Sequence, residues 1–290
     1  MTTWSSDPAA GGCRDCGAFL LDIVGRFGPA EVLVRWSDDR RRSNEDVDEL
    51  IEGVWQAQTR HAAENGKDLY NGRLCRLMEC ELAGRALRLT LAEVTYKEFV
   101  GTNLLNPQLR YLHGPEVLAD PLGVSAAVVT ADGFVLMGRR SARVFSHAGR
   151  LHPIGGIVQP GDHVGAVPDV FREVLRELHE ELALPAEQVE TPVCLGVVRA
   201  KAILQPELIF DVSVRADVET IRRAAAEAPD AAEHVEFVPI RDHPGAMVTY
   251  LETHYEALTP VALATLLLHG QRRWGMGWFA TARGYLRGVI

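Results

Sequence analysis

Residues 155–184 read GGIVQPGDHVGAVPDVFREVLRELHEELAL, and this stretch decides the fold of the chain. From residue 170 onward, apolar side chains recur every three or four residues, which is the spacing of one buried face on a helix. The members of this face are Phe171, Val174, Leu175, Leu178 and Leu182. We therefore predict an amphipathic helix over residues 170–183 whose apolar face joins the core.

Four glutamates lie on an adjoining face of this helix, because residues three and four apart are neighbours on a helix surface. They are Glu173, Glu177, Glu180 and Glu181. Carboxylates placed so close repel one another unless a positive charge lies among them, and oxygen ligands suit a hard dication, Mg²⁺ or Mn²⁺. The alternative interpretation is a solvated, glutamate-rich surface, which is how charge runs usually occur.

The order of residues in this stretch resembles the signature of the Nudix hydrolases. That signature is a glycine, five residues, a glutamate, seven residues and then Arg-Glu-apolar-x-Glu-Glu-x-Gly-apolar. Gly156 and the run RELHEE at 176–181 match it, whereas Asp162 replaces the glutamate, Ala183 replaces the second glycine, and the spacer covers residues 163–175. Because the RExxEE core is intact, we interpret the chemistry as present and the preceding loop as enlarged.

The rest of the chain predicts an α/β fold with a mixed sheet flanked by helices, in agreement with the α/β/α sandwich that the Nudix resemblance implies. We expect a smaller α+β domain at 1–120, with residues 1–17 poorly ordered, and a Nudix hydrolase domain at 121–290. The expected strands are 31–36, 73–81, 86–94, 124–130, 133–139, 193–201, 207–214 and 234–239. Besides 170–183, the expected helices are 44–65, 217–228, 244–256 and 260–270.

Several other segments resemble a narrower branch, the two-part Nudix proteins that include the animal UDP-glucose and UDP-galactose diphosphatase. These segments are TYKEFVGTN (95–103), LADPLGVSAAV (118–128), the long spacer 163–175 and PEL (206–208). The resemblance implies Mg²⁺-dependent hydrolysis of a nucleoside diphosphate sugar, UDP-glucose or UDP-galactose, to UMP and a sugar 1-phosphate. The alternatives are another nucleoside diphosphate compound, such as ADP-ribose or a dinucleotide, and a non-catalytic nucleotide-sensing module.

The resemblance also implies roles for residues of the signature. Glu177, Glu180, Glu181 and the carbonyl of Gly156 match metal-ligand positions, with Glu177 and Glu180 also catalytic candidates. Arg176 matches the arginine that orients the neighbouring glutamates, and its alternative is a plain helical ion pair with Glu180. Mg²⁺ is the expected cofactor, with Mn²⁺ as a substitute.

Four further side chains are candidates for substrate binding, and one for catalysis. Arg139 and Arg140 are adjacent on a strand and point to opposite sides of it, so at most one of them faces the site and clamps a phosphate. Tyr96 and Asn103 come from the first domain and are expected to cover the pocket, unless their segment only joins the domains. Glu207 is a ligand or base, or else an exposed glutamate at a strand edge.

Histidines near the signature carry weaker expectations than the glutamates. His147, His152 and His163 are close to the site in sequence. Single histidines in loops are more often structural or solvated than catalytic, so we do not assign them a role in the reaction.

Composition restricts the class of protein. The 290 residues are 47% hydrophobic and 24% charged, as in a globular protein, and the net charge of −9 offers no basic surface for nucleic acid. No apolar run is long enough to cross a membrane, and Asp22 interrupts the run FLLDIV, so we expect neither a membrane segment nor an export signal. Five cysteines suit the cytoplasm. Cys13-x-x-Cys16 stands alone, which favours a terminal tail over a zinc site, and the sequence leaves the oligomeric state open.

Overall fold

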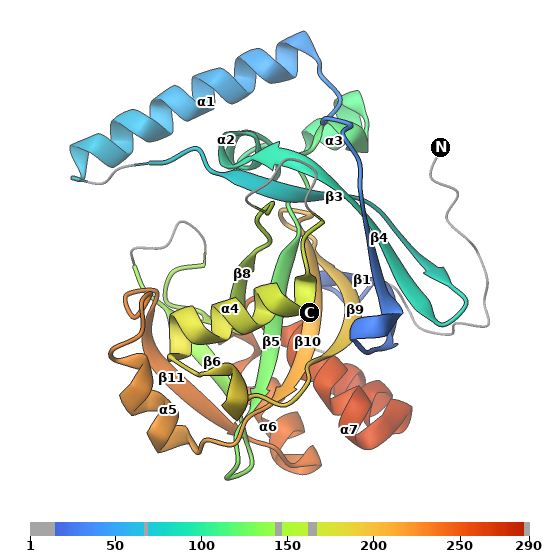
Figure 1. The fold of residues 1–290 in the computed structure, drawn as a ribbon, viewed down its shortest axis with the longest axis vertical. Coiled ribbons are helices and arrows are strands. Elements are labelled where there is room, and N and C mark those ends of the chain that lie inside the picture. Colours follow the sequence, from blue (N-terminus) through green and yellow to red (C-terminus); the bar gives the residue numbers. More distant parts are fainter. Residues whose placement is uncertain (1–14, 67–68, 143–146, 162–166, 287–290) are drawn as a thin grey trace.

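The computed structural model describes residues 15–66, 69–142, 147–161 and 167–286, whose strands form two sheets (Figure 1). Strands β10 and β5 run parallel, whereas β9 and β6 run antiparallel to them, so the larger sheet is mixed. In spatial order this sheet contains β1 (Phe19–Phe27), β9 (Val193–Ala200), β10 (Pro206–Ser213), β5 (Gly123–Val129), β6 (Phe134–Arg140) and β11 (His234–Arg241), with β8 (Ile154–Ile157) paired to β5 and β7 (Leu151–His152) paired to β6.

Helices cover both faces of the larger sheet. On one face, α4 (Val170–Leu182) and α5 (Val218–Ala225) bury their apolar side chains against Leu208 and Phe210 of β10. On the other face, α6 (Pro244–His254) and α7 (Pro260–Leu286) pack against Ile209 of the same strand. Alternate residues of β10 thus belong to two cores, which confirms the predicted α/β/α sandwich with a mixed sheet.

The smaller sheet lies across one end of the larger one (Figure 1). Its order is β2 (Val32–Trp36), β4 (Ala86–Thr95) and β3 (Arg73–Ala83), and α1 (Glu45–Glu64), α2 (Tyr96–Phe99), a π-helical turn (Val100–Leu104) and α3 (Leu109–His113) accompany it. The 3₁₀ turns within the described residues are Pro29–Glu31, Pro115–Val117, Ala186–Gln188 and Tyr255–Ala257. Cys75 links β3 to the larger sheet, because its N–H donates to the carbonyl of Val158 (2.9 Å) and its carbonyl accepts from the N–H of Leu122 (2.7 Å).

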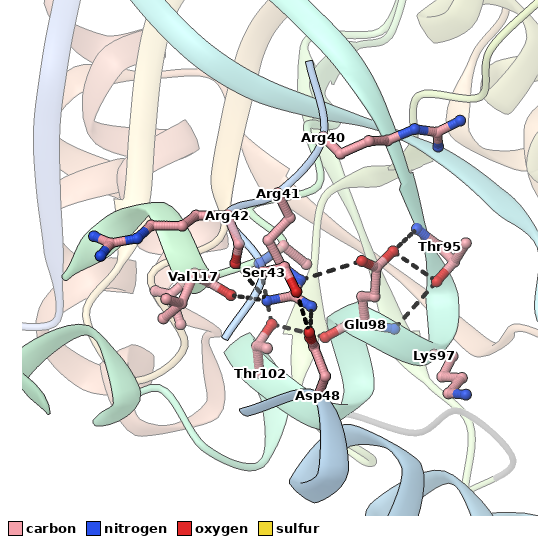
Figure 2. A network of polar contacts seen from close by, with 12 residues as sticks. Arg40, Arg41, Arg42, Ser43, Asp48, Thr95, Lys97, Glu98, Thr102 and Val117 are labelled. Carbon is pink, nitrogen blue, oxygen red and sulfur yellow. Dashed lines mark hydrogen bonds and ion pairs between the residues drawn. The ribbon is translucent and has the colours of Figure 1, made fainter. Parts of the chain in front are cut away.

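A buried arginine connects the helices that accompany the smaller sheet (Figure 2). The side chain of Arg41 is 6% exposed, and its guanidinium pairs with Glu98 of α2 (3.1 Å) and with Asp48 of α1. It also donates to the carbonyls of Arg42 (2.9 Å) and Val117 (3.3 Å). One side chain therefore joins the start of α1, α2 and the segment before β5.

A second buried network lies between the larger sheet and α7. His269 of α7 bonds through Nδ1 to Asp211 of β10 (3.1 Å) and through Nε2 to Asp242 (3.0 Å). Arg272 and Arg273 pair with the same two carboxylates. The paired acids stabilise the protonated imidazole and, against burial, raise the pKa of His269 to about 9.

The fold differs from the predicted elements in several places, and the short elements β7, β8, α2 and α3 were not among the expected strands and helices. Strand β1 was not predicted, because Asp22 interrupts its apolar pattern, yet it pairs with β9 and Asp22 pairs with Arg199 (2.7 Å). Residues 1–120 were predicted to form the first domain, yet β1 belongs to the larger sheet. The domain boundary at residue 120 stays a prediction. Helix α7 continues beyond residue 270, through a non-helical break at Gly275.

Some expectations fall outside the described part of the chain. Asp162, His163, Cys13 and most of the segment 1–17 belong to this group. Within the described residues, none of the helices combines the length and apolarity that a membrane span requires.

Candidate active site

Helix α4 begins and ends as its local sequence dictates. The side chain of Asp169 caps its first turn by accepting from the N–H groups of Phe171 (3.0 Å) and Arg172 (3.2 Å). Ala183 ends it in the left-handed conformation (φ 52°), which is the position where the signature carries glycine. Alanine in place of the signature glycine therefore raises the free-energy cost of this helix end but leaves its geometry unchanged.

Arg176 gathers three glutamates of the helix around its guanidinium. Its Nη2 lies 2.6 Å from Glu177 Oε1 and 3.0 Å from Glu173 Oε2, and its Nη1 pairs with Glu180. The ion pair with Glu180 is thus one contact of several, and the arginine also orients Glu177. These contacts place Arg176 where an orienting role requires it.

Glu177 lies against the backbone of β8. A Cβ atom at Gly156 would overlap its carboxylate, so only glycine leaves the room that this side chain occupies. Burial raises the pKa of Glu177 to about 8, partly opposed by the charge of Arg176. The protein therefore keeps a carboxyl group in a place that favours a further cation beside it.

Glu181 is the most deeply buried glutamate of the signature, with a residue exposure of 1%. Its Oε1 accepts from the N–H of Gly155 (3.0 Å), and its Oε2 lies 2.5 Å from Nε2 of His234 in β11. Burial raises the pKa of Glu181 well above its usual range. The sequence prediction missed His234, because β11 lies 53 residues away and no motif marks it.

The two adjacent arginines have different partners, and Arg140 is the one whose charge acts on the buried acids. Its charge acts to lower the pKa of both Glu181 and Glu207, although burial dominates at each, and it forms an ion pair with Glu233 (3.2 Å). Arg139 instead pairs with Glu236 (2.8 Å) and donates to the carbonyl of Gly149 (3.1 Å). The two side chains thus pair with different glutamates, and the expectation that at most one of them faces the site stays a prediction.

Glu207 is buried at the start of β10, so the alternative of an exposed strand-edge residue is wrong. The Ser125 hydroxyl donates to its Oε1 (2.5 Å), and its carboxylate rests over Gly123, where a Cβ would lie 2.6 Å from Oε2. Burial raises the pKa of Glu207 to about 7. The carboxyl group therefore titrates in the range where a general base operates.

Residues predicted from the first domain divide into two kinds. Tyr96 is half-buried and packs against a buried apolar cluster that Ile157 of β8, the residue after Gly156, also packs against, and its ring meets Trp55 edge-on with the ring centroids 6.3 Å apart. Asn103 is fully buried, and its amide donates to Asp120 (2.8 Å) and to the carbonyl of Ile203 (3.0 Å). The prediction of Asn103 as a substrate contact is corrected, because its side chain is committed inside the protein.

Of the histidines near the signature, His147 and His152 lie in the described part of the chain. Nδ1 of His152 bonds to the hydroxyl of Thr259 (2.8 Å), and burial keeps its pKa well below the usual range. His147 adopts a left-handed backbone (φ 56°), and burial lowers its pKa as well.

The donor chemistry of the site fits a hard divalent cation. Its ligand candidates are carboxylate oxygens, two of them buried with raised pKa values, beside a glycine that leaves room for Glu177. In the described residues no three acidic, histidine or cysteine side chains already converge as a metal-binding group. Contacts with Arg176 and His234 occupy part of the glutamate oxygens instead.

Curated relatives resemble the chain over part of its length. It is 34% identical over 178 residues to the human "Uridine diphosphate glucose pyrophosphatase NUDT22" (52% of this chain, 57% of that protein). It is 31% identical over 204 residues to the mouse protein of the same name (61% and 65%), and 24% identical over 252 residues to "Nudix hydrolase 9" of Arabidopsis thaliana (74% and 79%). The matches thus span 57–65% of the first two relatives, and these names confirm the resemblance to Nudix proteins of the UDP-glucose branch.

Solved structures resemble the chain at lower sequence identity than these relatives do. A MutT protein from Methanosarcina mazei Go1 is 20% identical, with a TM-score of 0.36 over 53% of this chain and 94% of that chain. The Nudix hydrolase RenU from M. smegmatis is 15% identical, with a TM-score of 0.35 over 53% and 85%. No family model matches the chain.

Proposed function

We propose that this chain is a Nudix-type diphosphatase that hydrolyses the diphosphate bond of a nucleoside diphosphate sugar with Mg²⁺ as cofactor. UDP-glucose and UDP-galactose are the preferred substrates, and UMP and a sugar 1-phosphate are the products. The observation that carries the proposal is the burial of Glu177 and Glu181 against the Gly155–Gly156 backbone. The names of the human and mouse relatives support the choice of substrate.

The residues that would hold Mg²⁺ are Glu177, Glu180 and Glu181, with the carbonyl of Gly156. Bound there, Mg²⁺ supplies charge shielding for the diphosphate and lowers the pKa of a bound water. Arg176 keeps Glu177 and Glu180 directed by charge-assisted hydrogen bonds, so that the site changes little when substrate arrives. This preorganisation is the contribution of the helix itself.

Glu207 is our candidate for proton acceptor from the attacking water. Its pKa of about 7 leaves it partly deprotonated near neutral pH, and the Ser125 hydroxyl fixes one of its oxygens. Oε2 of Glu207 stays available to receive a proton.

Substrate binding follows from the charge and aromatic surface around these acids. Arg140 would pair with a phosphate oxygen and offset repulsion between the substrate and the carboxylates. Tyr96 packs on the same apolar cluster as Ile157, and we propose that it covers the nucleoside part of the substrate. Arg139 holds Glu236 and supports the strand that carries Arg140.

The proposed location of the protein is a reducing compartment, the cytoplasm, because the chain has an odd number of cysteines.

A substrate panel tests the proposal. Purified protein with Mg²⁺ is given UDP-glucose, UDP-galactose, ADP-ribose and a dinucleotide, and the nucleotide products are separated by chromatography. We expect UMP from the UDP-sugars, and expect Glu181→Gln to lower kcat by orders of magnitude while His179→Gln, an exposed change on the same helix, does not. Cleavage of ADP-ribose alone would show that ADP-ribose, and not a UDP-sugar, is the substrate. Nucleotide binding without turnover would support a sensing module.

A further inference from the structure

We propose that His234 is a positioning residue that fixes Glu181 as the rigid ligand of the divalent cation, an inference that rests on the proposed function. The two side chains come from elements far apart in the sequence: Glu181 lies in the last turn of α4, and His234 begins β11. Their contact, Nε2 to Oε2 at 2.5 Å, is buried on both sides, with side-chain exposures of 2% and 1%.

The fold provides a dedicated place for the imidazole. His234 lies opposite Arg140 in the register between β11 and β6, and a register shift follows it before Glu236. A Cβ atom at Gly138 would overlap the imidazole ring, so the glycine on β6 leaves the space that the histidine fills. The ring of Phe237 lies 5.4 Å away and packs beside it. Backbone register, a glycine and a neighbouring ring therefore set the direction of Nε2.

The hydrogen-bond pattern assigns the proton to Nε2. In the described structure Nδ1 of His234 is buried and has no partner. A proton on Nδ1 would leave a buried N–H without an acceptor, whereas a proton on Nε2 donates directly to the Glu181 carboxylate. An unpaired lone pair on Nδ1 is the cheaper arrangement. His234 thus acts as a donor toward Glu181.

The hydrogen bond from His234 limits which lone pairs of the Glu181 carboxylate remain free to bind a cation. A carboxylate has about four lone-pair positions. The N–H of Gly155 occupies one on Oε1, and His234 occupies one on Oε2, so each oxygen keeps one lone pair in a fixed direction. Glu180, in contrast, has a 30% exposed side chain held by Arg176. Glu181 is therefore the rigid member of the set, and His234 is the side chain that fixes it together with the backbone of Gly155.

Mn²⁺ binding measures this role separately from turnover. Loss of the free Mn²⁺ signal in electron paramagnetic resonance gives the Kd for the full-length chain. Partners that orient metal ligands in this way contribute about 10–100-fold to metal affinity. We expect His234→Leu to raise the Kd for Mn²⁺ by about this factor and to lower kcat for UDP-glucose with little change in KM. His179→Leu, an exposed histidine of α4, is the matched control and should leave both quantities unchanged.

A conservative variant distinguishes positioning from packing. Glutamine at 234 keeps an N–H donor near the place of Nε2, so His234→Gln should recover most of the affinity that His234→Leu loses. If His234→Leu does not fold, Gly138→Ala provides the comparison, because its Cβ displaces the imidazole and should weaken Mn²⁺ binding more than His234→Gln does.

Three results would overturn the inference: wild-type Mn²⁺ affinity in a folded His234→Leu protein, equal losses in His234→Gln and His234→Leu, or wild-type affinity in Gly138→Ala. Wild-type protein that binds Mn²⁺ but cleaves no nucleotide sugar would refute the proposed function and leave the role of His234 to the Kd comparison.

Discussion

Replacing Arg41 by methionine should destabilise the protein far more than the same change at Arg40. Breaking a buried ion pair from one side costs about 3–5 kcal/mol when both partners are buried. The partners of Arg41 are 39% exposed (Asp48) and 26% exposed (Glu98), and each keeps another hydrogen bond, to Ser43 and to Thr95. We therefore expect a loss of about 2–3 kcal/mol in the free energy of unfolding for Arg41→Met.

Arg40→Met is the matched control, because Arg40 lies next in sequence (Figure 2) but its side chain is 67% exposed and pairs with Glu93. Exposed pairs contribute below about 1 kcal/mol. Urea unfolding followed by circular dichroism and by tryptophan fluorescence gives both values. If Arg41→Met lowers the free energy of unfolding no more than Arg40→Met does, then Arg41 does not hold α1, α2 and the segment before β5 together.

Three further changes test other parts of the structure. Gly156→Ala should lower kcat strongly while the thermal midpoint falls only slightly, because the new methyl group displaces Glu177; steady-state kinetics and a thermal scan check this. Ala183→Gly should stabilise the protein by up to about 1 kcal/mol in urea unfolding, because glycine adopts the left-handed cap without strain. His269 has a pKa raised from 6.5 to about 9, so its stabilising effect is complete below pH 6.5 and disappears as pH rises through 9. The difference in unfolding free energy between wild type and His269→Gln should shrink over that range, and a constant difference would contradict the assignment.

Local sequence was sufficient for the helix at the centre of the site. The three- and four-residue spacing of Phe171 to Leu182 predicts which face is buried, and the structure buries that face. The run RELHEE places Arg176 within reach of its glutamates, because positions three and four apart on a helix meet whatever the rest of the chain does. The strands expected at 73–81 and 86–94 likewise form, as the antiparallel pair β3 and β4.

Tertiary structure decided what surrounds that helix. Strand β1 joins the larger sheet although its apolar pattern is broken, because its pairing with β9 places Asp22 beside Arg199, whose charge neutralises it. Asn103 is committed to Asp120 and Ile203, partners that no local pattern identifies.

Residues 155–184 by themselves determined the acidic helix and the match of Gly156 to the signature, because those depend on spacing along one segment, whereas the strand β8 that carries this glycine forms by pairing with β5. The partner of Glu181 depended on the register of β11 against β6 and on the space over Gly138. Such a contact joins residues 53 apart in the chain, and only packing of the whole sheet brings them within hydrogen-bonding distance.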